Sequence, residues 1–417
     1  MIHSHANSSR ALVVSKILAS ATSFIWLAIL AKYLPSDSLG TVFKCLFISQ
    51  SLVFITDQGL TQTLVRQQSS GLSLDDDISR INQCVRIRFK RAIVLLPVLI
   101  VLLQFLTEAS TYAMFAVAIS HVATLIYSTI NAGLLGSNLR YIETISEPSS
   151  RLFILCFGTL TLFLFDQLRN AQFVIFAYAA ADAFMLVSVL YFYLTISSSA
   201  TKVSHVKFEV EQKFRVESTL AGGTLSTVGI GETWALSIRS SSSDFAFYGL
   251  ITRFVDISGL VASYAGYSHI PILVKAIHES SLSQLIRRVR RIILLSFIPT
   301  AGLVCVVLAA RLGRISLQGY DVIASWLPLL TLVLSTPAVV MSKYLMMTIG
   351  ILDPRGLMFF NFFSGLIATV GVLWVYELSG LSAIFIVLAL VNFLRAFWLG
   401  LLTKGIHSRL KNTEVSM

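Results

Sequence analysis

Residues 172–195 read QFVIFAYAAADAFMLVSVLYFYLT, and Asp182 is the one side chain in this stretch that is charged at neutral pH. A helix needs about 20 consecutive apolar residues to cross the hydrocarbon core of a bilayer, so the stretch predicts a transmembrane helix. The whole chain of 417 residues is similar in composition, with 55% hydrophobic and 13% charged residues, against about 25% charged in an average soluble protein. We therefore expect an all-α polytopic membrane protein of about twelve transmembrane helices, with spans near 11–34, 39–65, 92–107, 112–136, 148–165, 172–195, 218–238, 245–272, 292–310, 322–347, 356–376 and 381–403.

The positive charges alternate between the two ends of these spans. Of the 32 Lys and Arg residues, 23 fall on the N-terminus and the even-numbered connections, 5 on the opposite side and 4 inside spans. Lys and Arg accumulate in cytoplasmic loops, so this bias predicts that both termini are cytoplasmic. The net charge of +11 then reflects membrane topology, and we expect no nucleic acid partner.

The sequence lacks the usual signatures of metal, nucleotide and disulfide sites. Its four cysteines, Cys45, Cys84, Cys156 and Cys305, stand in no CxxC or Cys/His spacing, so we expect neither a zinc site nor a disulfide framework. No GxxxxGK[ST] sequence occurs, which excludes ATP hydrolysis by a P-loop of this chain. We expect no metal and no cofactor, and we interpret the apolar run after Lys16 as an uncleaved first span.

A polar stretch rich in Ser, Lys and Glu divides six predicted spans from six. We predict an N-terminal six-helix bundle at 1–196, a cytoplasmic linker at 197–217 and a C-terminal six-helix bundle at 218–417. Each half opens with a long helix, a short Ser-Asp loop and a helix that carries a basic residue, Lys44 in one half and Arg253 in the other. Both openings run from inside to outside, which predicts pseudo-symmetric halves with the substrate between them.

Ionisable side chains inside the spans are the candidate functional residues. Each costs at least about 2.5 kcal/mol in hydrocarbon unless it has a partner or a wet cavity. His121, Asp182 and Asp256 are predicted near mid-depth, and Glu232 lies in the outer half of its span. Any of these four groups could be the protonatable residue that couples transport to an ion gradient, and a purely structural role is the alternative for each.

Three of the charged residues fall on helices that open the two halves and would line a central cavity: Lys44, Glu232 and Arg253. Fixed cations suit a substrate with phosphate or acidic sugar groups, because an Arg fork matches phosphate oxygens bidentately. The structural alternative is that Arg253 pairs with Asp256, three residues later on the same helix face. Arg395, nearer the cytoplasmic end of its span, is expected to snorkel to the inner surface.

Two patches of the sequence carry motifs of a known family. They are LAKYLP at 30–35 with Leu39-Gly40 and DQGL at 57–60 with Arg66, and then YGLITR at 248–253 followed by Pro271. These motifs and the order of the spans resemble the polysaccharide transporter family, the Wzx-type flippases of O-antigen repeat units within the multidrug/oligosaccharidyl-lipid/polysaccharide exporter superfamily. The resemblance implies two six-helix bundles in a V around a cavity, with Asp57 and Arg66 at the inner gate and Lys44 and Arg253 lining the cavity.

The resemblance further implies a flippase of the bacterial inner membrane. Its expected substrate is an undecaprenyl-pyrophosphate-linked oligosaccharide, moved from the cytoplasmic to the periplasmic leaflet by alternating access, and its expected partners are a polysaccharide polymerase and a chain-length regulator. The alternative is an ion-coupled small-molecule or drug antiporter of the same superfamily.

An enzyme of polysaccharide synthesis fits the sequence less well. Such enzymes usually need a sizeable outer loop, and the outer loops here are about 4 to 12 residues, on the scale of ordinary short connections. A structural scaffold would leave the charges inside the spans without a role. We therefore predict a transporter and not an enzyme.

Overall fold

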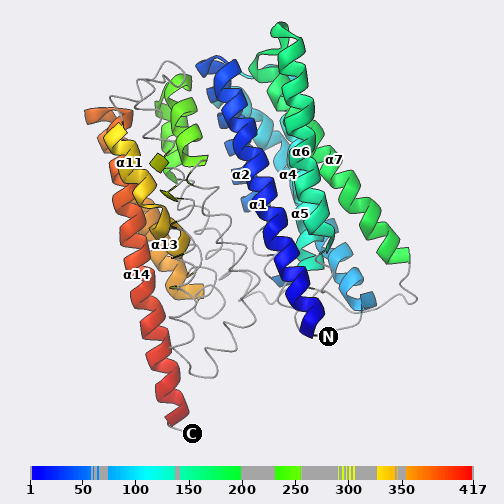
Figure 1. Ribbon diagram of the computed structural model, residues 1–417, viewed down its shortest axis with the longest axis vertical. Helices are drawn as coiled ribbons and strands as arrows, with labels where there is room; N and C mark the ends of the chain where they lie inside the picture. The colour runs from blue at the N-terminus through cyan, green and yellow to red at the C-terminus, as the bar shows by residue number, and fades with distance from the viewer. Residues whose placement is uncertain are drawn as a thin grey trace. The chain divides into compact units, whose positions relative to one another are not determined.

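The structure is a computed structural model that describes residues 2–57, 74–136, 141–198, 231–253, 326–342 and 354–415, with a few single residues between them. Helices are the only regular secondary structure in these ranges (Figure 1). The named elements are α1 (Ile2–Tyr33), α2 (Ser36–Asp57), α4 (Leu74–Leu106), α5 (Thr111–Gly136), α6 (Tyr141–Leu164), the 3-10 turn η1 (Asp166–Leu168), α7 (Ala171–Ser198), α11 (Trp326–Leu334), α13 (Pro354–Ser379) and α14 (Leu381–Val415). The predicted all-α polytopic fold is confirmed.

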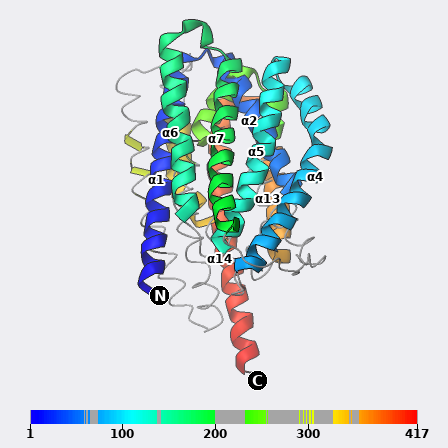
Figure 2. The ribbon, with the colours of Figure 1, turned by 90° about the vertical axis from the view of Figure 1, so that its right-hand side faces the viewer.

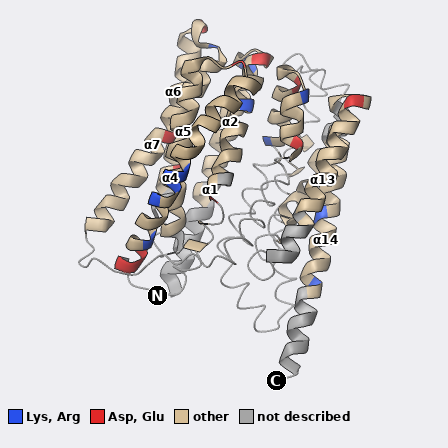
Figure 3. Cartoon of the chain, turned by 180° about the vertical axis from the view of Figure 1, so that it is seen from behind, with Lys and Arg blue, Asp and Glu red and all other residues tan. Residues whose placement is uncertain are grey.

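Five of the described helices are long and apolar enough to cross a membrane, within Asp75–Leu106, Thr111–Leu134, Ala171–Ser198, Phe362–Ser379 and Ala383–Gly405. Large apolar side chains point outward from them, with Phe105 81% exposed and Val94 72% exposed. Apolar surface of this extent is a liability in water but is expected where lipid tails surround the protein. Figure 3 shows long stretches of these helices without a charged residue. The helices are therefore suited to a bilayer by both length and surface.

The chain divides into two units, the first made of Met1–Gly223 with Ser241–Ala246 and the second of Thr224–Ser240 with Phe247–Met417. The bounds predicted for the two bundles and their linker stay predictions, because residues 199–217 lie outside the described ranges.

In the first unit, α2 contacts α4, α5 and α7 (Figure 2). Beside these contacts, α1 packs on α6, and α5 packs on both α4 and α7. The approach of α1 to α6 depends on Gly158, because a Cβ at this position would overlap the buried indole of Trp26. Glycine at such a crossing allows two membrane helices to come close together.

The helix α4 corrects one sequence prediction. It begins at Leu74, whereas the predicted span begins at residue 92, so the basic stretch before the span is helical. Asp75, Asp76 and Asp77 occupy its first turn, where negative charge is favourable near the positive end of the helix dipole. Consequently Arg88, which the sequence analysis placed in a connection, is a helical residue with only 3% of its surface exposed.

In the second unit, both α11 and α13 pack on α14. Gly380 joins α13 to α14 with φ of 73°, a left-handed conformation that glycine adopts without strain. After α11 the helical path bends at Ser335, because Pro337 has no N–H to donate to the carbonyl of Val333. The Thr336 hydroxyl donates to that carbonyl instead, at 2.6 Å. The bend is thus stabilised locally, and the helix continues to residue 342 beside α14.

Candidate functional site

The first unit holds a partly buried carboxylate, Asp182 of α7, which faces α5. The hydroxyl of Ser120 donates a short hydrogen bond to its Oδ2, and Tyr127, two turns further along α5, donates a second hydrogen bond to the same carboxylate. Arg151 of α6 adds an electrostatic attraction. Two hydroxyl donors and a nearby cation can hold a carboxylate inside the helices, and the same hydroxyls can relay a proton to it.

Next to Ser120 on α5, His121 is completely buried against α2. Its Nδ1 lies 3.2 Å from the backbone oxygen of Ser49 and 3.4 Å from the Ser49 hydroxyl. A carbonyl oxygen can only accept, so Nδ1 carries the proton in this bond and a neutral ring presents a lone pair at Nε2. Within the described ranges this Nε2 has no hydrogen-bond partner. His121 is therefore a buried imidazole with a lone pair at Nε2, one residue away from the donor to Asp182.

A buried ion pair joins α2 to α4. Arg88 Nη2 lies 3.2 Å from Asp57 Oδ1, and the two side chains are 3% and 17% exposed. Arg88 Nη1 also donates to the hydroxyls of Thr129 at 2.6 Å and Ser128 at 3.3 Å, both on α5. The guanidinium therefore connects three helices around the C-terminal end of α2. A cation at a helix C-terminus is favoured by the helix dipole as well as by the carboxylate.

Lys44 of α2 is also buried, with 8% of its surface exposed. Its Nζ lies 5.8 Å from the ring centroid of Phe245, which belongs to the Ser241–Ala246 segment of the first unit. The segment approaches α2 at Gly40, where a Cβ would overlap the backbone of Ser242. The Leu39-Gly40 motif is thus explained by a close backbone contact, and Lys44 by a cation–π contact.

The second unit holds a separate buried charge pair. Glu232, in the helical segment 231–239, is 7% exposed, and Arg395 of α14 is 5% exposed. The negative charge of Glu232 attracts the guanidinium of Arg395, and the hydroxyls of Thr233 and Tyr248 lie 3.1 Å apart. The expectation that Arg395 snorkels to the surface is wrong, because an acidic partner within the protein holds it inside.

The remaining predicted site residues divide into two groups. Arg253 is half-buried in the helical segment 242–253, whereas Arg66 and Asp256 lie outside the described residues, so their assigned roles stay predictions. No cluster of metal-ligating side chains occurs in the part of the chain that the structure describes. Of the predicted residues, Asp182 of α7 is bonded to Ser120, the residue next to His121 on α5, and Asp57 is paired with Arg88.

Sequence reasoning missed Arg88, Ser120 and Tyr127. The position of Arg88 could have been found, because Ile81, Cys84, Arg88 and Ala92 follow one another at helical spacing and are all buried. No comparable signal existed for the two hydroxyl residues, because Ser and Tyr are ordinary residues of membrane helices. Their role depends on which face of α5 meets α7.

Comparisons with known proteins identify the fold. No family model matches the sequence, and no curated protein matches it significantly. Among solved structures, a MOP superfamily transporter from Pyrococcus furiosus, described as having a binding pocket of reverse polarity, is similar at TM-score 0.71 and 12% identity over 97% of this chain and 96% of that one. A multidrug resistance MATE family transporter of the MOP superfamily, in an outward-facing conformation, matches at TM-score 0.69 and 14% identity over 97% and 96% of the two chains. A MATE transporter from Vibrio cholerae matches at TM-score 0.64 and 12% identity over 99% and 98%.

These similarities cover nearly the whole length of each chain. They establish that this chain has the fold that these transporters share. Its long apolar helices are those of a multi-pass membrane protein. None of these three structures is a Wzx-type flippase, so the finer resemblance to that family stays a prediction.

Proposed function

We propose that this protein is an ion-coupled secondary transporter that exports a small organic molecule by alternating access. The proposal depends on Asp182, a carboxylate held inside the first unit by hydroxyls of Ser120 and Tyr127. An ionisable group inside membrane helices is expensive and is usually kept for ion or proton movement. The fold supports this function, since the multidrug resistance transporter noted above shares it. Asp182 would bind and release the coupling ion, with His121 as a second proton acceptor.

The charge of Lys44 bears on the substrate. A buried cation on α2 repels organic cations and attracts anions, and this interaction is stronger away from water. We therefore expect a neutral or anionic substrate rather than a cationic dye.

The charge distribution supports cytoplasmic termini. The proposed location, the bacterial inner membrane, is the one that the resemblance to Wzx-type flippases implies. The chain is proposed to act as a carrier and not as an enzyme, through two six-helix halves separated near residues 197–217.

The experiment that tests the proposal is an efflux assay in cells that lack their own exporters. Cells that make the protein should accumulate less of an anionic dye such as fluorescein, and a protonophore should abolish the difference. Asp182→Asn should behave like empty vector at equal protein level. If the Asp182→Asn variant exports as well as the wild type, the assigned coupling role is wrong.

A second candidate function is flipping of an undecaprenyl-pyrophosphate-linked oligosaccharide, with a polysaccharide polymerase and a chain-length regulator as partners. The observation that favours it is the buried Lys44 beside the motifs at 30–40, since a fixed cation suits a pyrophosphate group. The proposed inner gate of Asp57 and Arg66 would then include Arg88, which engages Asp57 directly. Accumulation of the lipid-linked oligosaccharide in the cytoplasmic leaflet of cells lacking the protein, reversed by the wild type, would select this function over the first.

A further inference from the structure

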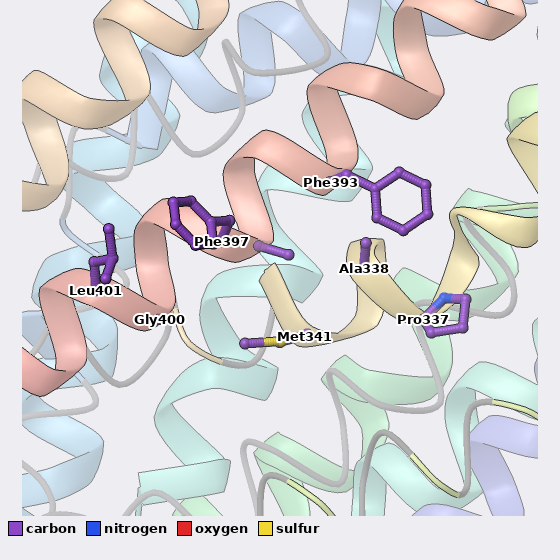
Figure 4. A pocket seen from close by; sticks show the side chains of 8 residues that line it. Pro337, Ala338, Met341, Phe393, Phe397, Gly400 and Leu401 are labelled. Atoms are coloured by element: carbon purple, nitrogen blue, oxygen red, sulfur yellow. The ribbon is translucent and has the colours of Figure 1, made fainter.

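An apolar groove runs along α14 in the second unit. Figure 4 shows its lining, with Pro337, Ala338 and Met341 on the helix that follows α11, and the residues of α14 opposite them. The α14 side chains are Phe393, Ala396, Phe397, Gly400 and Leu401, and the groove has a volume of about 500 Å³.

The shape of the groove follows from the bend at Ser335 and from small residues. The Asn392 amide donates to the Ser335 hydroxyl at 3.1 Å and fixes the bend against α14. Further along from this bond, the small residues Ala338, Ala396 and Gly400 line the bottom of the groove and leave space between the two helices. Phe393 and Phe397 form the wall, and both keep half or more of their surface exposed. The groove is thus built by a fixed contact and is open on one side.

The chemistry of the lining determines what can occupy it. Among the described residues, no charged or hydrogen-bonding side chain lines the groove, and its α14 residues lie within the apolar span Ala383–Gly405. An occupant must therefore present hydrocarbon at membrane depth. A chain of methylene groups gains about 0.8 kcal/mol for each group it buries, without any hydrogen bond.

Lys404 supplies the second observation. It is exposed and lies four residues after Gly400, which places it on the same face of α14 and about 6 Å further along the axis. The charge bias assigns this end of α14 to the cytoplasmic surface. A cation at the end of an apolar groove matches a phosphate attached to a hydrocarbon chain.

We propose that this groove binds an anionic phospholipid of the cytoplasmic leaflet, with one acyl chain along Phe393–Leu401 and the headgroup phosphate at Lys404. The lipid fills the space between the bent helix and α14, and it holds the C-terminal end of α14 at the membrane surface. The site is independent of the transport function proposed above, since none of its residues belongs to the buried charge clusters.

The test is native mass spectrometry of the purified full-length protein, titrated with phosphatidylglycerol or phosphatidylcholine of the same acyl chains. The wild type should retain one phosphatidylglycerol more tightly than phosphatidylcholine. Gly400→Leu fills the groove at a position where a Cβ makes only ordinary contact with Met341, at 3.6 Å, and should lose retention of both lipids. The matched control is Gly405→Leu, where a Cβ would meet no atom within 4 Å, and it should bind like the wild type.

The headgroup contact has its own test. Lys404→Gln should weaken phosphatidylglycerol binding about five-fold, as expected for one basic residue near a membrane surface, and leave phosphatidylcholine binding unchanged. Lys32→Gln, an exposed Lys of α1, is the control and should have no effect. Equal binding by Gly400→Leu and the wild type would overturn the proposal. So would a lack of preference for phosphatidylglycerol, tighter retention of a polyprenyl phosphate, or a dimer that excludes lipid.

Discussion

Replacing Arg88 by Gln should destabilise the first unit more than any other single change to its polar residues. The variant loses the 3.2 Å ion pair with Asp57 and the two hydrogen bonds to Thr129 and Ser128. Breaking a buried ion pair by removing one partner costs about 3 to 5 kcal/mol, because the other charge is left without compensation. Asp57 is 17% exposed and can recover some hydration, so we expect the lower end, about 3 kcal/mol. For a unit of this size that corresponds to a fall in melting temperature of about 6 to 12 °C.

The assay is thermal unfolding of the detergent-purified protein, followed by the loss of the monodisperse peak in size-exclusion chromatography. Lys90→Gln is the control, because Lys90 is an exposed residue two positions further along α4, and it should melt like the wild type. The double variant Asp57→Asn with Arg88→Gln should be more stable than Arg88→Gln alone, since it leaves no uncompensated charge. If Arg88→Gln melts within 1 °C or so of the wild type, or if the double variant is the sum of the single ones, the pair does not hold α2 to α4 as described.

Three further predictions follow from the other contacts. Asp182→Asn should abolish ion-driven transport and keep the melting temperature near that of the wild type, so a variant that still transports would exclude this carboxylate from coupling. Gly158→Leu should cost about 1 to 3 kcal/mol, because its Cβ would overlap the indole of α1, whereas Gly405→Leu should cost little in the same thermal assay. Glu232→Gln should cost about 3 kcal/mol or more by leaving Arg395 buried without its acidic partner, and the added change Arg395→Gln should restore much of the loss; no restoration would show that the two charges are not coupled.

The sequence could predict the fold because its physical signal is strong. Stretches such as 172–195 are too apolar for any environment except lipid or a protein core, and their repetition along the chain indicates a helical membrane protein. The bounds of the helices were harder to predict from the sequence. The basic part of α4 has too few apolar residues to be predicted as part of a span. Ile81 and Cys84 nevertheless continue the buried face of the helix toward its N-terminus.

The candidate site could be predicted only one residue at a time. The cost of burying charge identified Asp182, Glu232 and His121, because each is ionisable within an apolar stretch, whereas Asp57 came from the family resemblance. Their partners could not be predicted, since the contacts of Asp182 depend on which face of α5 meets α7. The snorkelling prediction for Arg395 failed for the same reason, because depth in a span does not reveal an acidic group on another helix.

The most direct test of the central claim is ion movement in proteoliposomes that contain the purified protein and a pH-sensitive dye inside, with fluorescein or a neutral drug added outside. Ion-coupled exchange predicts that adding the substrate changes the internal pH, or moves sodium in a parallel experiment with a sodium dye, and that Asp182→Asn abolishes the response. Substrate movement with no accompanying flux of either ion, or an unchanged flux in Asp182→Asn, would contradict the assignment of this protein as a transporter coupled through Asp182.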